Sequence, residues 1–340
     1  MKKKIISVAK YMVFLAIGIG LFWLAIRGED INKILNEFRH ANYGWVLFSV
    51  VFMIASHILR ALRWNQLIKT LRYKTKAHTT FYAVMIGYFV NLAVPRLGEI
   101  TRCGVLARHN KIPVHSVIGT VIAERAFDII SLAIILLVTF FSQIYFLRDF
   151  FTIHIVDPIV SKFPSGLSAS IAIFGGGILF ILVIALLYKA LLSQIKKFPF
   201  FYKIKRLIIG FLDGIKTIKR IKQKKIFLLY SFLMWLMYLM TIYFCFFSIK
   251  ATSGLSIIDG LTVLAIGSIG VLAPTPGGVG AYQYVVGITL VGLFQIDRVS
   301  ASTFANIVFF SQWLLIIIFG GLSWVILFLS QKKINKNEHN

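Results

Sequence analysis

The sequence predicts an all-α polytopic membrane protein with six full spans and two broken, re-entrant helical hairpins. Hydrophobic residues fill 58% of its 340 positions, and the mean hydropathy is +0.83. The formal net charge is nevertheless +25. A soluble domain does not combine these properties, whereas a membrane protein with Lys and Arg in the loops of one side does. The charges interrupt apolar runs and form no separate basic domain, so we expect no nucleic-acid partner.

Six apolar runs are long enough to cross a bilayer, which takes about 20 largely apolar residues. They cover residues 5–26, 43–62, 117–141, 170–192, 226–247 and 303–329. The first run follows a basic start that resembles a signal peptide. It is long for one, and no small-residue cleavage pattern follows before Arg27, so we expect it to be retained as a span.

Two further apolar segments, about residues 79–107 and 257–294, are interrupted by proline and glycine and are predicted to form the hairpins. Backbone freed inside a bilayer persists only where protein or a watery cavity surrounds it. At an offset of 180 residues the segments share identical residues, namely Gly87 and Gly267, Leu92 and Leu272, Ala93 and Ala273, Gly98 and Gly278. Matched interruptions in two halves are typical of transporter binding sites and predict an inverted repeat. For the second segment, the alternative of a hairpin that reaches right across the membrane is left open.

Basic residues set the predicted orientation. With both hairpins returning to the side they entered, 28 Lys and Arg fall on one side and 7 on the other. This excess predicts that both termini are cytoplasmic. Residues 197–225 then form a cytoplasmic basic segment whose apolar residues recur every three or four positions, as in a helix lying on an anionic leaflet. We treat residues 1–340 as a single transmembrane domain.

Three polar clusters lie inside apolar segments, where charge is costly and usually faces a cavity or a partner. The first interruption carries Asn91, Arg96, Glu99 and Arg102. The run 117–141 carries Glu124, Arg125 and Asp128, of which the first and last share a helix face. The second interruption carries Thr275, Gly277, Gly278, Tyr282 and Gln283. The backbone breaks are expected at Pro95, Gly98, Pro274, Pro276 and Gly280.

We interpret these clusters as the lining of one polar chamber that binds an anionic group. Helices that restart at Gly98 and at Gly278 would present free N–H groups and the positive ends of their dipoles. The planar fork of arginine can bind two phosphate oxygens, which makes a lipid phosphate the natural occupant. The carboxylates would fix the arginines or carry protons or cations.

A purely structural interpretation is equally open for one of these clusters. Glu124, Arg125 and Asp128 would then form buried ion pairs that lock helices together. For Asn306 and Gln312 on the last run, interhelical hydrogen bonding is favoured. The histidines show no ligand spacing and predict no metal site, and we expect neither a catalytic residue nor a cofactor.

These motifs resemble the lysylphosphatidylglycerol synthase transmembrane-region family, also called flippase-like membrane proteins. The matching stretches are Asn91-x-x-x-Pro95-Arg96-x-Gly98-Glu99-x-x-Arg102, Glu124-Arg125-x-x-Asp128, Pro274-x-Pro276-Gly277-Gly278-x-Gly280 and Arg60-Ala-Leu-Arg63-Trp64. The similarity runs over essentially the whole chain. The family commonly has Glu shortly after the second glycine motif, whereas this chain has Gln283, which removes the carboxylate that would relay protons or bind a cation.

The resemblance implies a bacterial inner-membrane protein that handles lipids. In multidomain relatives this region moves aminoacylated phosphatidylglycerol between leaflets, and a soluble domain makes that lipid; we expect no synthase domain here. Our hypothesis is a lipid translocase, not an enzyme, for an anionic phospholipid, aminoacyl-phosphatidylglycerol or polyprenyl-phosphate-linked lipid. The alternative is a membrane transferase, or an accessory partner of a lipid-modifying enzyme, acting on polyprenyl-phosphate-linked sugars. The same interrupted segments and charged clusters also fit a transporter of soluble small molecules or ions.

Overall fold

The structure is a computed structural model that describes residues 2–95, 97–143, 221–273 and 275–338. Every secondary-structure element in these ranges is helical, as the sequence predicts. By its internal contacts the chain divides into two compact units, residues 1–136 with 214–340, and residues 137–213. The predicted span 170–192 and nearly all of the predicted segment 197–225 lie outside the described residues. The candidate site lies within the first unit.

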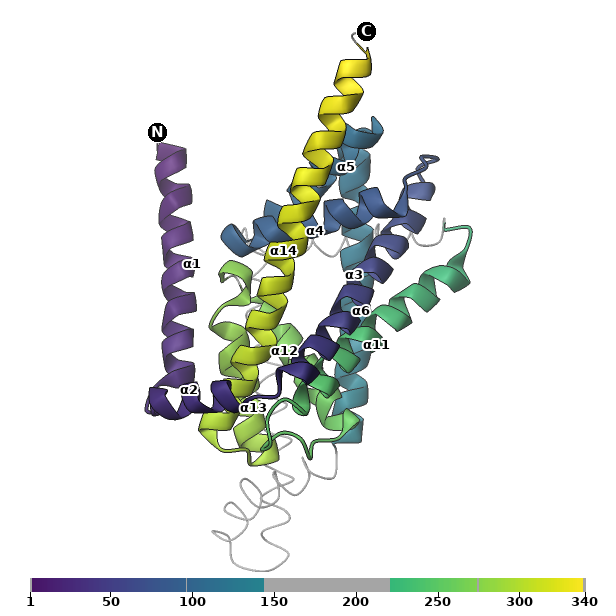
Figure 1. Cartoon of the computed structure of the whole chain (residues 1–340). Coiled ribbons are helices and arrows are strands. Elements are labelled where there is room, and N and C mark those ends of the chain that lie inside the picture. Colours follow the sequence, from purple (N-terminus) through teal and green to yellow (C-terminus); the bar gives the residue numbers. More distant parts are fainter. Residues whose placement is uncertain (1, 96, 144–220, 274, 339–340) are drawn as a thin grey trace, which may run out of the picture. The chain divides into compact units, whose positions relative to one another are not determined.

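Ten α-helices and one short 3-10 helix follow one another in the described ranges (Figure 1). The first six are α1 (Lys2–Ile26), α2 (Ile31–His40), α3 (Tyr43–Lys69), α4 (Ala77–Ala93), α5 (Leu97–Asn110) and α6 (Val114–Ser142). The others are α11 (Lys224–Phe246), α12 (Ile257–Leu272), η2 (Pro276–Gly278), α13 (Ala281–Phe294) and α14 (Arg298–Glu338). Local signals set these bounds: Ser256 and Asp259 form a capping box at the start of α12, and α4 ends just before Pro95.

Four described stretches are long and apolar enough to cross a membrane: α3, α11, Pro276–Phe294 and Arg298–Ser330. A fifth arises if α1 and α2, which meet at a bend of 84°, count as one broken span. The predicted spans 43–62, 226–247 and 303–329 therefore lie on three of these stretches, whereas α6, which contains the predicted span 117–141, is not one of them. The chain is a multi-pass membrane protein, and the number of six full spans stays a prediction.

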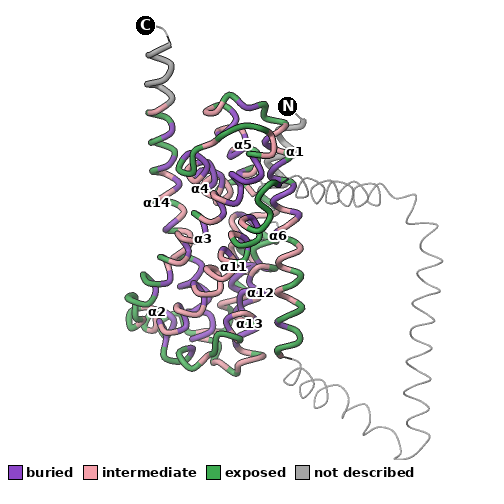
Figure 2. The backbone as a smooth tube through the Cα atoms, turned by 90° about the vertical axis from the view of Figure 1, so that its right-hand side faces the viewer, coloured by how far each residue is buried: buried purple, intermediate pink, exposed green. Residues whose placement is uncertain are grey.

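The distribution of polar and apolar side chains fits a lipid solvent. Leu47, Phe232 and Phe328 are 68%, 66% and 63% exposed, and many other large apolar side chains also lie on the surface. Arg63 and Glu124, in contrast, are both 0% exposed. Figure 2 shows buried and exposed residues interleaved along the same helices. Charge inside and apolar surface outside is the pattern expected where the bilayer replaces water.

Helices α3 and α11 pack against each other and run antiparallel (Figure 1). Near the start of α3, the Trp45 ring stacks on Phe244 at a centroid distance of 6.0 Å. Near its end, Arg63 Nη1 lies 3.5 Å from Ser231 Oγ. Early residues of one helix thus meet late residues of the other. This pairing brings the C-terminal half of α3 beside the first turns of α11.

The helix order α3–α4–α5–α6 occurs a second time as α11–α12–α13–α14, with starting residues displaced by 180 to 184 positions. Close contacts within the two broken helix pairs recur at the same displacement. In the first pair, Gly87 lies next to Arg102 and Gly98 next to Asn91. In the second pair, Gly267 lies next to Tyr282 and Gly278 next to Val271. Both halves of the chain therefore build their broken pair with small residues at the same places.

Candidate functional site

The first break separates α4, which ends at Ala93, from α5, which begins at Leu97. The side chain of Asn91 bridges it, because its Oδ1 accepts a hydrogen bond from the Gly98 N–H at 2.7 Å. The two arms approach so closely that a Cβ on Gly98 would lie 1.9 Å from the Gly87 carbonyl oxygen. The expectation of a free N–H at Gly98 is therefore wrong, since Asn91 occupies that donor.

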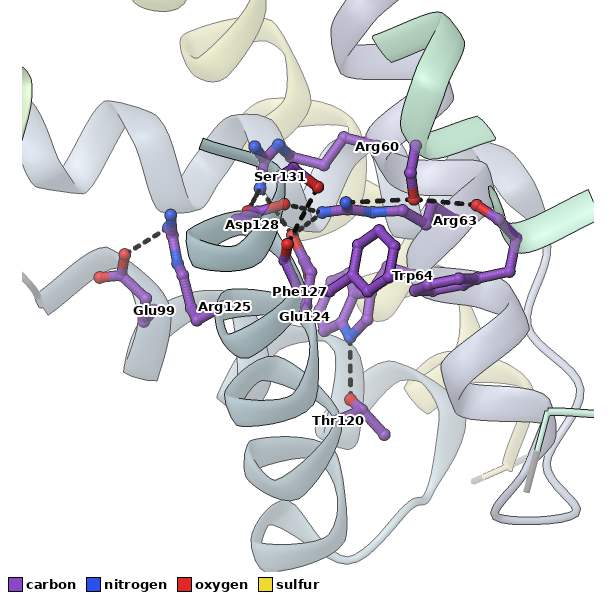
Figure 3. A network of polar contacts seen from close by, with 12 residues as sticks. Arg60, Arg63, Trp64, Glu99, Thr120, Glu124, Arg125, Phe127, Asp128 and Ser131 are labelled. Atoms are coloured by element: carbon purple, nitrogen blue, oxygen red, sulfur yellow. Dashed lines mark hydrogen bonds and ion pairs between the residues drawn. The ribbon is translucent and has the colours of Figure 1, made fainter. Parts of the chain in front are cut away.

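Two arginines of α3 and two carboxylates of α6 form a buried ion-pair network (Figure 3). Arg60 Nη1 donates to Glu124 Oε1 at 2.7 Å and to Asp128 Oδ2 at 2.9 Å. Arg63 Nη2 donates to Asp128 Oδ1 at 2.5 Å and lies 3.5 Å from Glu124 Oε1. The shared face of Glu124 and Asp128, predicted from their spacing, is thus directed at α3.

Arg102 of α5 reaches the same network from the hairpin. Its Nη2 lies 3.2 Å from Glu124 Oε2, and its guanidinium carbon lies 4.7 Å from the centre of the Trp64 ring. The indole N–H of Trp64 donates to Thr120 Oγ1 at 2.9 Å, which fixes the ring as a platform. Arg102 is 3% exposed, yet its Nε and Nη2 have no hydrogen-bond acceptor among the described residues. Its Nε therefore has no partner among the described residues, and its Nη2 makes the ion pair with Glu124.

The buried network carries a net positive charge. Counted over the described residues, three arginines oppose two carboxylates, and all five side chains belong to residues at most 9% exposed: Arg60, Arg63, Arg102, Glu124 and Asp128. An uncompensated charge in a low-dielectric interior is unfavourable. An anion bound beside Arg102 would balance it.

A more exposed ion pair joins α5 to α6. Arg125 Nη2 donates to Glu99 Oε1 at 2.6 Å, with side chains 40% and 28% exposed. A small cavity of about 10 Å³ lies beside this pair and the hairpin backbone. It is lined by Val84, Gly87, Tyr88, Asn91, Gly98, Glu99, Arg102 and Arg125. This cavity, which we call the first-break chamber, holds about one water molecule in the present conformation.

The second break contains η2 and three glycines in left-handed backbone conformations. Gly277, Gly278 and Gly280 have φ of 57°, 84° and 78°. The α13 helix restarts at Ala281, so the predicted restart at Gly278 is wrong by three residues. The Gly280 N–H donates to Gln283 Oε1 at 2.8 Å. Gln283 therefore caps the start of its own helix, a task that needs only a carbonyl oxygen.

The chemistry at the second break is neutral. Thr275 Oγ1, Tyr282 OH and Gln283 Nε2 are buried and have no hydrogen-bond partner among the described residues. A Cβ on Gly280 would lie 2.0 Å from the Gly18 carbonyl oxygen, so α1 packs directly on this break. In the described ranges no three His, Cys, Asp or Glu side chains gather as metal ligands.

The structure brings together the predicted residues of the first break and of α6, but not all predicted residues in one chamber. Asn91, Glu99, Arg102 and Arg125 line the first-break chamber, and Glu124 and Asp128 lie behind it. The described residues predicted at the second break lie in η2 and α13 or next to them, and none of them lines that chamber; η2 nevertheless contacts α4. Arg96 and Pro274 lie outside the described residues.

Three residues of the network were absent from the predicted site: Arg60, Arg63 and Trp64. Each is at most 5% exposed, although the arginines count as cytoplasmic charges in the sequence-based topology. The available signal was spacing, because arginines three residues apart on α3 share a helix face. Setting Arg60, Arg63 and Arg102 aside leaves 25 basic residues against 7, so the predicted excess remains.

The chain matches one protein family and, over part of its length, two individual proteins. The family described as lysylphosphatidylglycerol synthase TM region matches residues 11–320. UPF0104 membrane protein MJ1595 of Methanocaldococcus jannaschii is 30% identical over 145 residues, which is 42% of this chain and 42% of that protein. Glycosyltransferase AglD of Haloferax volcanii is 25% identical over 129 residues, 38% of this chain and 20% of that protein. The matched stretch covers less than half of either relative, and no solved structure matches.

Proposed function

The chain belongs to the lysylphosphatidylglycerol synthase TM region family, and on that premise we propose that it is a lipid translocase. Its substrate class is a lipid with an anionic headgroup: an anionic phospholipid, aminoacyl-phosphatidylglycerol or a polyprenyl-phosphate-linked lipid. The headgroup enters the first-break chamber while the hydrocarbon chains stay in the bilayer. The family supports a role in lipid metabolism, and the relative named as a glycosyltransferase supports glycolipid metabolism.

The observation that carries this proposal is the surplus arginine of the buried network. Arg102 combines three properties that suit phosphate recognition. It lines the chamber, its Nε lacks an acceptor among the described residues, and Trp64 packs against its guanidinium plane. Two oxygens of a phosphate match the guanidinium fork. Binding such a group cancels the net charge of the network and offsets the desolvation of its arginines.

The chamber must widen before a headgroup can enter, since about 10 Å³ holds no more than a water molecule. The Glu99–Arg125 pair is suited to open. Its side chains are partly exposed, and exposed ion pairs contribute only about 0–1 kcal/mol. The ion pairs of Arg60 and Arg63 are buried and remain in place. We assign Glu99–Arg125 as a gate and the α3–α6 pairs as the fixed wall.

An inverted repeat supplies the motion in this proposal. The recurring helix order supports it, and so does the antiparallel packing of α3 and α11, which are the equivalent first helices of the two halves. Rocking of one half against the other alternates access to the chamber. We place both termini in the cytoplasm at the bacterial inner membrane, with segment 197–225 on the inner leaflet.

Reconstitution in liposomes tests translocation directly. Vesicles with and without the protein carry a trace of fluorescent phosphatidylglycerol, lysyl-phosphatidylglycerol or undecaprenyl phosphate, and an external quencher reports the label that reaches the outer leaflet. Fluorescent phosphatidylcholine, with no net charge, is the control lipid. We expect the protein to accelerate exchange of at least one of these three lipids and not of phosphatidylcholine. Exchange equal to that in protein-free vesicles for all three lipids refutes the proposal.

A second candidate function rests on the match to Glycosyltransferase AglD. The chain would then serve, as a transferase or an accessory partner, in a reaction on polyprenyl-phosphate-linked sugars. The same chamber would hold the prenyl phosphate. Incubating the purified protein with a radiolabelled sugar donor and prenyl phosphate separates the two cases. Label transferred to the lipid favours a transferase, whereas leaflet exchange without transfer favours the translocase.

A further inference from the structure

A second cavity lies at the start of α4, apart from the first-break chamber. Its volume is about 460 Å³, and its walls come from the α3–α4 loop, the first turn of α4 and the last turn of α5. This volume is within the usual range of small-molecule pockets, about 300–1,000 Å³. It shares no lining residue with the first-break chamber.

One wall of the cavity concentrates positive charge and hydrogen-bond donors. Lys74 and Lys76 are exposed and line it. The α4 helix begins at Ala77, and no side chain caps its first N–H groups. Those N–H groups and the positive end of the helix dipole therefore lie beside the lining residues His78 and Thr79. An anion at this place would meet both lysines and the helix end.

Thr79 is the feature that points to a ligand. It lines the cavity and is 2% exposed, and no hydrogen bond of its hydroxyl is found among the described residues. The neighbouring hydroxyls of Thr75 and Thr80 each donate to Asn65 Oδ1 at 2.5 Å, which holds the loop and the helix start in place. The Thr79 hydroxyl is thus a preorganised donor for a ligand.

Two further lining residues, His109 and Asn110, offer acceptors. His109 Nδ1 and Asn110 Oδ1 are buried atoms without a hydrogen-bond partner in the described part of the chain. Burial, together with nearby His78, lowers the pKa of His109 below its ordinary value. The ring is therefore neutral near pH 7, and one of its nitrogens can accept a hydrogen bond from a ligand hydroxyl. Donors and acceptors in one cavity suit a phosphate attached to a hydroxylated group.

We propose that this cavity binds a phosphate-bearing anion, held by Lys74, Lys76, Thr79 and the start of α4. The inference goes beyond the proposed translocation, because it uses no residue of the first-break chamber. Free phosphate and the headgroup of an anionic lipid share this chemistry. The α4 helix, 17 residues long, spans roughly 25 Å between this cavity and the first break.

The test is binding to the full-length protein in a nonionic detergent. One arm titrates inorganic phosphate by calorimetry; the other adds mixed micelles of phosphatidylglycerol, with phosphatidylcholine micelles as blank. We expect saturable binding of at least one of the two anionic probes. The double variant Lys74→Gln, Lys76→Gln should weaken it about tenfold or more, and Thr79→Val about threefold to tenfold. Thr79→Ser, which keeps the hydroxyl, should restore the affinity.

The matched control is the double variant Lys33→Gln, Lys250→Gln. It removes the same charge from exposed residues that do not line the cavity and lie outside segment 197–225. Its affinity should stay within about twofold of wild type. Binding of phosphate identifies a site for the free anion, and binding of phosphatidylglycerol micelles only identifies a headgroup site. Absence of saturable binding, or equal affinities of the Thr79→Val, lysine and control variants, overturns the inference. Failure of lipid exchange alone leaves it standing.

Discussion

Arg60 and Arg102 approach the same carboxylate, Glu124, from different helices, and they differ in what surrounds them. Arg60 Nη1 donates two short hydrogen bonds, to Glu124 and Asp128. Arg102 Nη2 is within 3.2 Å of Glu124 but is not aligned for a hydrogen bond. We therefore interpret Arg60 as a structural partner of α6 and Arg102 as the group that meets a substrate.

Asp128→Asn should destabilise the protein strongly. The change leaves Arg60 and Arg63 with Glu124 as their one remaining carboxylate in the described network. Removing one partner of a buried ion pair costs about 3–5 kcal/mol. Thermal unfolding in detergent, followed by circular dichroism, measures the loss.

Glu99→Gln is the control for that change. It also removes one carboxylate from an arginine, but the Glu99 and Arg125 side chains are 28% and 40% exposed. The expected loss is about 0–1 kcal/mol. Equal losses for Asp128→Asn and Glu99→Gln would contradict the division into a fixed wall and a gate.

At the scale of elements, the broken helix pairs depend on glycines at which two backbones touch. Gly98 meets Gly87 within the first pair, and Gly280 meets Gly18 of α1 at the second break. A side chain at Gly98 would push α5 away from α4, and a side chain at Gly280 would push the second break away from α1. In both places these elements position polar groups. The chamber therefore rests on close backbone approach as well as on charge.

Gly98→Ala should disrupt the first hairpin. The added Cβ would lie 1.9 Å from the Gly87 carbonyl oxygen and 2.7 Å from Asn91 Cγ. Overpacking of this kind costs roughly 1–3 kcal/mol or more. Gly104→Ala on the same helix is the control, because a Cβ there meets no atom within 4 Å. Midpoints of thermal unfolding should fall for Gly98→Ala only; an unchanged midpoint would show that the arms are not so closely packed.

Gly280→Ala should loosen α1 from the second break. Its φ of 78° disfavours a side chain, and the Cβ would lie 2.0 Å from the Gly18 carbonyl oxygen. We expect more rapid proteolysis after Arg27 than in wild type, since α1 loses its packing on the break. The control is Gly287→Ala on α13, where a Cβ meets nothing within 4 Å. Equal digestion rates of the two variants would argue against this packing.

At the scale of the whole molecule, the proposed alternating access requires opposite insertion of two equivalent halves. The backbone N–H of Asn42 donates to the Ser248 carbonyl oxygen at 2.8 Å, so the start of α3 and the end of α11 lie together. The loop after α3 and the residues before α11 then lie at the other ends of this antiparallel pair. A bilayer crossed by both helices separates these two regions.

Cysteine labelling tests that orientation in a background without Cys103 and Cys245. An impermeant thiol reagent should modify Lys74→Cys and Lys222→Cys from the cytoplasmic face, and Arg27→Cys and Lys250→Cys from the opposite face; all four positions are exposed. Intact cells and inverted vesicles distinguish the faces. Labelling of Lys74→Cys and Lys250→Cys from one face would contradict opposite insertion.

Local features of the structure could be predicted from the sequence, and long-range partners could not. The expected breaks at Pro95 and Pro274 lie two residues after the ends of α4 and α12, because broken backbone has a local cause. The spacing of Glu124 and Asp128 predicted their common face. Their partner Arg60 lies 64 residues from Glu124, and nothing in the local pattern selects it. The same limit hid the role of Trp64 as a platform for Arg102, which lies on another helix.

The most direct test of the central claim compares Arg102→Met with Arg60→Met in the liposome assay. Each change removes one positive charge from the same buried network, but only Arg102 lines the first-break chamber. Arg102→Met leaves two arginines against two carboxylates and should unfold within a few degrees of wild type, whereas Arg60→Met should be strongly destabilised. The account predicts that folded Arg102→Met loses anionic lipid exchange by about tenfold or more. Wild-type exchange by Arg102→Met would contradict it.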